Sequence, residues 1–207
     1  HGYQCGLLWG AVLAAGAETY NRYGAGPQAE TRAVYAAQKL VDSFTAQNGT
    51  INCLEITEID KSSTTWQMIN YFLIKGGTAG CIRRAVKYAR QAHKEINDAL
   101  SEEHKETSCN PASCAAMLAK KLGASDRHTV MAAGLAGGIG FSGGACGALG
   151  AALWLMGMEV IKEEGIKNLW SNKVYNHRME AVMARFMKHT DYTFECSEIA
   201  GRKFEDA

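Results

Sequence analysis

The amino-acid sequence predicts an all-α protein: a tandem duplicated helical repeat packed as a bundle with pseudo-two-fold symmetry. Three observations lead to this prediction. Apolar residues recur at helical spacing in most segments, whereas the alternation of apolar and polar residues that is typical of strands is scarce. The 207 residues include 22 glycines and 2 prolines, a composition that favours helices joined by glycine-rich turns. One sequence pattern also occurs twice, which indicates an internal repeat.

The repeated pattern begins with a cysteine. Cys5 opens CGLLWGAVLAAG and Cys146 opens CGALGAALWLMG, an offset of 141 residues (146 minus 5). Further along, Cys53 in CLEI matches Cys196 in CSEI at an offset of 143 (196 minus 53). We therefore expect a first repeat over 1–105 without its leading part and a second over 106–207 without its trailing part, together forming one compact unit. The identical pairs at the first offset are Gly6 and Gly147, Leu8 and Leu149, Ala11 and Ala152, Gly16 and Gly157, Glu18 and Glu159, and Gly24 and Gly165.

Start and stop signals divide the first half into helices. The first helix is predicted over 4–23. The second begins after Pro27, because proline suits the first turn of a helix, and it stops at 48–49, an Asn-Gly pair. Polar residues at 60–70 lead into a short helix, and a glycine loop precedes a long helix over 82–103.

The second half carries similar signals. A helix capped by Asn110 is predicted to end at Gly123, and the next starts near Ser125 and includes Leu135. The repeated cysteine-led helix follows a glycine loop. An amphipathic helix over 173–189 then ends shortly before the last cysteine, as its counterpart does in the first half.

The charge balance excludes several classes of partner. With 22 basic and 21 acidic residues the net charge is +1, so we expect neither a nucleic-acid partner nor an anionic membrane surface. The uncharged run 129–158 contains nine glycines that split it into pieces too short to cross a bilayer, so we expect no membrane span. The sequence opens on His1 rather than methionine. We favour a cytoplasmic location, with an exported mature form as the alternative.

Cys146 has the setting that most needs a chemical explanation. Six glycines precede it within 134–144, and glycine allows positive φ and close backbone approach, which suits an enclosed ligand or a tight helix contact. At the first turn of a helix, unpaired N–H groups and the helix dipole favour a thiolate. A buried cysteine beside a crossing of small residues is the alternative, and we expect Gly6, Gly10, Gly147 and Ala151 to line such a crossing.

The cysteine pattern resembles the C_GCAxxG_C_C family, whose members are classed as redox-active. In the second half, 145–150 follows the family core, with Cys146 and Gly150 in place and the small residues Ala145 and Gly147 exchanged. In the first half Trp9 stands where the motif has its second glycine. The resemblance implies Cys114 or Cys109 as the leading cysteine of the second half, with Cys146 and Cys196 following. For the first half it implies Cys5, Cys53 and Cys81.

The family is also similar to the amino-terminal part of split-Soret cytochromes c, in which such cysteines are associated with an iron–sulfur centre. The resemblance therefore implies an iron–sulfur cluster of unspecified type. Because the chain has no C-x-x-C-H, covalent c-type haem is not expected. Glycine N–H groups near the cysteines are implied to bond cluster sulfur. The implied metal ligands are Cys146, Cys196, Cys114, Cys5, Cys53 and Cys81, and the implied cofactor-binding glycines are Gly144, Gly147 and Gly150.

Other functions stay open at this stage. One alternative is a metal-free thiol–disulfide oxidoreductase, with Cys146 as the reactive thiolate and Cys196 or Cys114 resolving it. Another is a binding or structural protein with buried cysteines. Cys81 and Cys114 could each serve the opposite half. Arg83 and Arg84 could lower the pKa of a thiol, although such residues are more often solvated. Whether the chain is an enzyme, which redox protein it meets and whether it forms a homodimer are left open.

Overall fold

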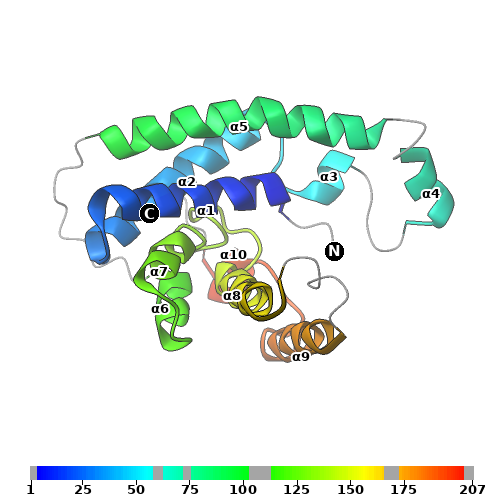
Figure 1. The fold of residues 1–207 in the computed structure, drawn as a ribbon. Helices are drawn as coiled ribbons and strands as arrows, with labels where there is room; N and C mark the ends of the chain where they lie inside the picture. Colours follow the sequence, from blue (N-terminus) through cyan, green and yellow to red (C-terminus); the bar gives the residue numbers. More distant parts are fainter. Residues whose placement is uncertain (1–3, 58–62, 72–75, 103–112, 166–172, 203–207) are drawn as a thin grey trace.

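The computed structural model describes residues 4–57, 63–71, 76–102, 113–165 and 173–202 (Figure 1). Within these ranges the regular structure is helical, apart from one isolated β-bridge between Ala145 and Glu195, so the all-α prediction is confirmed. None of the described helices is long and apolar enough to cross a membrane. The helices are α1 (Gly6–Tyr23), α2 (Pro27–Asn48), α3 (Cys53–Thr57), α4 (Thr65–Ile69), α5 (Gly77–Ser101), α6 (Cys114–Lys121), α7 (Asp126–Ala133), α8 (Gly147–Glu164), α9 (Lys173–His189) and α10 (Cys196–Ala200).

The two halves form two layers that share a core. In Figure 1, α5 lies along one side of α1 and α2, and the second-half helices lie on the other side. Helix α7 packs against both α1 and α2, so it joins the layers. Side chains from both halves, among them Leu8, Phe44, Leu135 and Ala151, belong to one cluster of buried residues. The second half therefore completes the core that the first half begins.

Hydrogen bonds at matched positions confirm the duplication. The Cys5 N–H donates to the carbonyl of Ile51 at 2.7 Å, and the Cys146 N–H donates to the carbonyl of Phe194 at 2.9 Å. Each acceptor lies two residues before the next cysteine of its own half. Helices α1 and α8 each span 18 residues, and each ends at a glycine with positive φ. The repeat predicted from the cysteines is thus a repeat of backbone structure.

Most predicted boundaries agree with the structure, and three need correction. Helix α5 begins at Gly77 rather than at 82, because Gly76 takes a left-handed conformation (φ 67°) and turns the chain into the helix earlier. The hydroxyl of Ser113 accepts from the N–H of Ala116 and caps α6; Asn110, Pro111 and the predicted repeat boundary at 105 and 106 lie outside the described residues. Helix α7 ends at Ala133, so Leu135 belongs to the following loop.

The loop from Gly134 to Cys146 explains the density of glycines. Gly137, Gly138, Gly140 and Gly143 all have positive φ. A Cβ on Gly140 would overlap the backbone of Ala37. Of the two uses predicted for these glycines, the structure therefore shows the tight contact between segments of the chain itself.

The predicted crossing of small residues is wrong for α1 and right in part for α8. Gly6 and Gly10 are exposed, with open space where a Cβ would lie, whereas Gly147 and Ala151 are buried. The contact between the two repeated helices is instead made by Trp9, whose ring lies where a Cβ on Gly150 would be. Trp9 and Gly150 are equivalent positions of the repeat, so their contact lies at the pseudo-two-fold axis. Only one of two such positions can carry a large side chain there, which accounts for the departure of Trp9 from the motif.

Gln4 links this contact to the glycine loop. Its buried amide donates from Nε2 to the carbonyl of Gly138 at 2.8 Å, and its Oε1 accepts from Nε1 of Trp9 at 3.1 Å. The first bond connects the residue before the N-cap of α1 with the loop that precedes Cys146, and the second connects the same amide to Trp9 within α1. The amide therefore holds the two halves in register at the axis.

We expect Gln4→Leu to lower the free energy of unfolding by about 1–3 kcal/mol, because the indole N–H of Trp9 would be left without its acceptor in a partly buried place. Denaturant unfolding would measure the loss. Gln28→Leu, on the exposed start of α2, is the matched control and should change stability by less than about 0.5 kcal/mol. Equal effects of the two substitutions would contradict the role given to Gln4.

Candidate functional site

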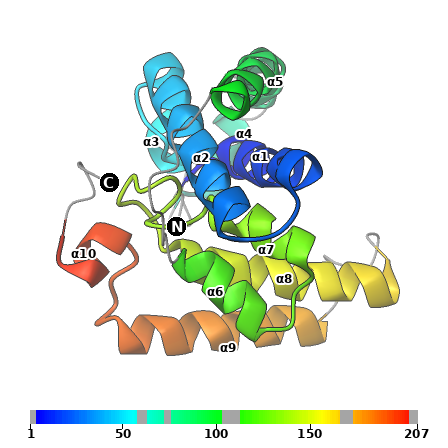
Figure 2. The same ribbon diagram turned by 90° about the vertical axis from the view of Figure 1, so that its left-hand side faces the viewer.

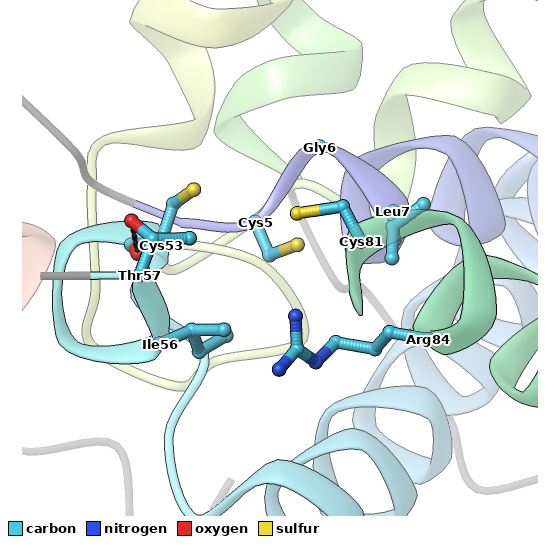
Figure 3. Close-up of a pocket in the computed structure, with 8 residues that line it drawn as sticks. All are labelled: Cys5, Gly6, Leu7, Cys53, Ile56, Thr57, Cys81 and Arg84. Atoms are coloured by element: carbon cyan, nitrogen blue, oxygen red, sulfur yellow. Dashed lines mark hydrogen bonds between the residues drawn. The ribbon is translucent and has the colours of Figure 1, made fainter. Parts of the chain in front are cut away.

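Three cysteines of the first half line one cavity of about 230 Å³. Cys5 is the N-cap of α1, Cys53 is the first residue of α3, and Cys81 lies just after the first turn of α5. Figure 3 shows that Cys5, Cys81 and Arg84 extend into the space between α1, α3 and α5. The remaining lining residues are Gly6, Leu7, Ile56 and Thr57.

Hydrogen bonds hold the elements that carry these thiols. The Cys5 N–H donates to the carbonyl of Ile51, which ties the start of α1 to the segment before Cys53. The Thr57 hydroxyl donates to the carbonyl of Cys53 at 2.7 Å and closes the short helix α3. The hydroxyl of Tyr71 lies 3.9 Å from the sulfur of Cys81. Cys5 is buried, and the other two thiols are half-buried.

The cavity disfavours negative charge on its thiols. Burial raises the pKa of the Cys53 thiol above its usual value, and the nearby thiols of Cys5 and Cys81 raise it further. The Thr57 hydroxyl and the Arg84 guanidinium act in the opposite direction. Arg84 is half-buried and lines the cavity, whereas Arg83 is exposed. Of the two arginines considered from sequence, Arg84 thus belongs to the site and Arg83 lies on the surface.

The second half brings Cys146 and Cys196 close together, with Cys114 farther out. Cys146 is the N-cap of α8, and Cys196 is the first residue of α10. The bridge between Ala145 and Glu195 joins their neighbours, and the Cys196 N–H donates to the carbonyl of Gly144 at 2.7 Å. Burial raises the pKa of Cys196 to about 11, with Cys146 and then Cys114 raising it further. Cys114 therefore lies within electrostatic reach of Cys196, although it is exposed at the start of α6.

Each half therefore groups its own cysteines. Cys81 lies with Cys5 and Cys53, and the charge of Cys114 acts on Cys196, so the structure does not support an exchange of these two cysteines between halves. The six described cysteines are free thiols. Cys109 lies outside the described residues.

The glycines predicted to bind a cofactor all pack closely against the chain itself. A Cβ on Gly144 would meet the side-chain amide of Gln4, one on Gly147 the carbonyl of Leu135, and one on Gly150 the ring of Trp9. The space that a side chain would occupy at each of these glycines is thus filled by other residues of the protein. Their role toward a cofactor stays a prediction, and the N–H of Gly150 already donates to the carbonyl of Cys146 and that of Gly144 to the Ser142 hydroxyl.

No histidine joins either group in the part of the chain that the structure describes. The ring of His128 stacks edge-on against Trp154, with centroids 5.5 Å apart, and His93 contacts the side-chain amide of Asn97. Across the same residues, no three His, Cys, Asp or Glu side chains gather tightly enough to hold a metal ion as they stand.

Two residues of the first site were undervalued or missed from sequence. Arg84 and Arg83 are both candidates from sequence for lowering a thiol pKa, and the spacing of three residues after Cys81, which places two side chains on the same face of a helix, could have singled out Arg84. Tyr71 carried no sequence signal, because its contact with Cys81 arises only in the folded chain.

We expect the thiols to make the metal-free protein less stable at alkaline pH. A thiol whose pKa is raised on folding binds its proton more tightly in the folded chain, so its contribution is complete below pH 9.0, the usual value, and is lost as the pH rises to about 11. For Cys196 the loss is about 1–2 kcal/mol after allowance for its partial exposure. Denaturant midpoints across this range would measure it, and Cys196→Ser should remove most of the slope. Stability that rises with pH in this window would contradict the prediction.

Comparison with known proteins identifies the family. A family model described as "Putative redox-active protein (C_GCAxxG_C_C)" matches the chain twice, over residues 1–91 and 107–207. The two matches coincide with the two cysteine groups and with the structural repeat. No curated protein and no solved structure matches the chain. Because the two matches together span most of its length, the chain belongs to the C_GCAxxG_C_C redox-active protein family.

Proposed function

We propose that the protein binds two iron–sulfur centres, one in each half, and transfers electrons or senses redox state through them. The observation that supports this most directly is the cavity of about 230 Å³ lined by Cys5, Cys53 and Cys81. The matching backbone bonds of Cys5 and Cys146 support a second centre of the same kind at Cys146, Cys196 and Cys114. The family description supports a redox role in general.

The geometry of the first site suits a group of several atoms better than a single ion. A single zinc ion needs four ligands that converge to about 2.3 Å from one point, and the described side chains are not gathered in that way. An iron–sulfur cluster is instead held by thiolates arranged around a larger core. Three soft thiols around a cavity supply three of the four thiolates that such a cluster ordinarily takes. The residues present therefore fit the proposed group.

The protein's own residues would prepare the site for a positively charged centre. When bound, the cluster would supply one-electron chemistry. Because burial and neighbouring thiols raise the pKa of Cys53, the thiols keep their protons until metal displaces them, so binding should release protons. Leu7 and Ile56 line the cavity and limit access of water, and Arg84 offsets the negative charge that three thiolates would carry.

The metal-free oxidoreductase is the second candidate, supported by the proximity of Cys146 and Cys196 across the β-bridge. Its attacking group must be a thiolate. A thiol with a pKa of about 11 is ionised in only about one molecule in ten thousand at neutral pH, so Cys196 would be slow to resolve a disulfide formed on Cys146. The raised pKa of Cys196 thus weighs against the resolving step that the metal-free oxidoreductase needs.

Anaerobic purification tests the proposal. We expect a brown protein that contains iron and acid-labile sulfide and that loses visible absorbance on reduction. A colourless protein with no iron after reconstitution, but with thiols that form a disulfide reversibly, would favour the oxidoreductase. Thiols inert to oxidants and to iron would contradict both and support a structural role.

A further inference from the structure

The equivalent helices α1 and α8 differ in what covers one face. Gly6, Gly10 and Ala14 lie one turn apart and are all exposed, a row that we call the open stripe. A Cβ placed on Gly6 or Gly10 would meet no atom within 4 Å. At the offset of 141, the same row in α8 consists of Gly147, Ala151 and Leu155. Gly147 and Ala151 are buried, and Leu155 packs against the main core cluster.

The chain segment just before α8 covers that second row. The carbonyl of Leu135 lies against Gly147 so closely that a Cβ there would overlap it. Helix α6 contacts α8, which it crosses at an angle in Figure 2, and its Ala115 and Ala119 are completely buried in the same cluster as Ala151. Small residues on both helices allow the backbones to approach closely. The segment against α8 thus consists of the alanine-faced helix α6 and, after α7, the loop that carries Leu135.

The start of α6 has a chemical consequence for the second site. Cys114 is the first residue of α6, and its charge acts on Cys196. The packing of α6 against α8 therefore places a cysteine at the start of a helix that contacts the Cys146 helix. In the first half, the open stripe lies on α1, which begins at Cys5, but it has no such helix against it in the described part of the chain.

We infer that the open stripe of α1 is a docking surface for a partner helix of the α6 kind, with alanines four residues apart and a cysteine as its first residue. The internal repeat identifies this occupant, because α8, whose equivalent row is buried, packs against such a helix within the same molecule. Docked in the equivalent way, the partner brings a fourth thiol to Cys5, Cys53 and Cys81. The docking of the helix is independent of the proposed function, and only the use of its thiol as a metal ligand rests on that function.

A chain with a duplicated segment tests the inference directly. Residues 113–141 precede the position equivalent to His1, since 142 minus 141 is 1, so a second copy of this segment joined before His1 keeps the register of the repeat. We expect the added helix to dock on the open stripe. The melting temperature should rise by about 4 °C or more, and amide hydrogen exchange in the first turns of α1 should slow at least about tenfold.

Gly10→Leu is the matched control, because it fills the open stripe. It should be tolerated in the original chain and should abolish both gains in the extended chain. Unchanged melting and unchanged exchange in the extended chain would overturn the inference. If the extended chain aggregates, a peptide of residues 113–141 added to the original chain, scored by the same exchange measurement, decides the matter in the same way.

A second copy of the chain is the rival occupant. If the original chain is a dimer whose first turns of α1 are already protected from exchange, and Gly10→Leu separates it into monomers, the inference is wrong. Neither measurement needs iron. A failure here therefore leaves the iron–sulfur proposal standing, and a failure to bind iron leaves the docking surface standing.

Discussion

Gly147→Leu is expected to lower the free energy of unfolding by about 3 kcal/mol or more, whereas Gly6→Leu at the equivalent position should change it by less than about 1 kcal/mol. Both residues begin an 18-residue helix directly after a cysteine. A Cβ on Gly147 would overlap the carbonyl of Leu135, and backbone cannot rotate away as a flexible side chain can. A Cβ on Gly6 meets open space.

Thermal and denaturant unfolding of both variants would measure this difference. Gly6→Ala should stabilise the protein by roughly 0.5–1 kcal/mol, because alanine is the better helix former at an open position. Comparison of Gly147→Leu with Gly6→Leu separates the effect of packing from that of helix propensity, since the two glycines have similar sequence neighbours and the same position in their helices. Similar losses for Gly147→Leu and Gly6→Leu would show that the contact with Leu135 contributes little.

The second large effect is expected at the thiols. Cys5→Ser and Cys146→Ser should each reduce iron and sulfide content to about half, and the double variant should bind almost none, because a hydroxyl is a poor ligand for this type of cluster. Serine preserves size, so the helical circular dichroism of each variant should remain that of the parent. Iron analysis and visible absorbance of anaerobically reconstituted protein would measure the loss.

Controls decide how this result is interpreted. Ala145→Ser alters the neighbour of Cys146 without removing a thiol and should leave the iron content unchanged, since Ala145 joins Glu195 through the backbone. Complete loss of iron in either single variant would indicate one shared centre in place of two. Full iron content in the double variant would exclude Cys5 and Cys146 as ligands.

The arrangement at the pseudo-two-fold axis has a consequence for both predictions. Trp9 follows Cys5 by one turn, and Gly150 follows Cys146 by one turn, and the two residues contact each other. Gln4 bonds both Trp9 and the loop before Cys146. The amino ends of α1 and α8, which carry the central cysteine of each half, are therefore coupled mechanically. Disturbance of one half at this point should be measurable in the other.

The sequence by itself determined the helical class, the duplication and the family. These follow from local and repetitive signals: apolar periodicity, Pro27 and the Asn48-Gly49 pair as boundaries of α2, and the recurrence of the pattern at Cys5 and Cys146. Such signals are contained within a few turns of chain. They can be recognised without knowing which segments of the chain pack against each other.

Tertiary structure alone decided which residues of these repeats meet. Gly6 and Gly147 are identical in sequence setting, yet one is open and the other is covered by Leu135. Arg84 became part of a cavity and Arg83 did not, because α5 presents only one side to Cys5 and Cys53. A duplicated sequence repeats local structure, but each copy has different neighbours, and burial, close contact and the pKa of a thiol depend on those neighbours.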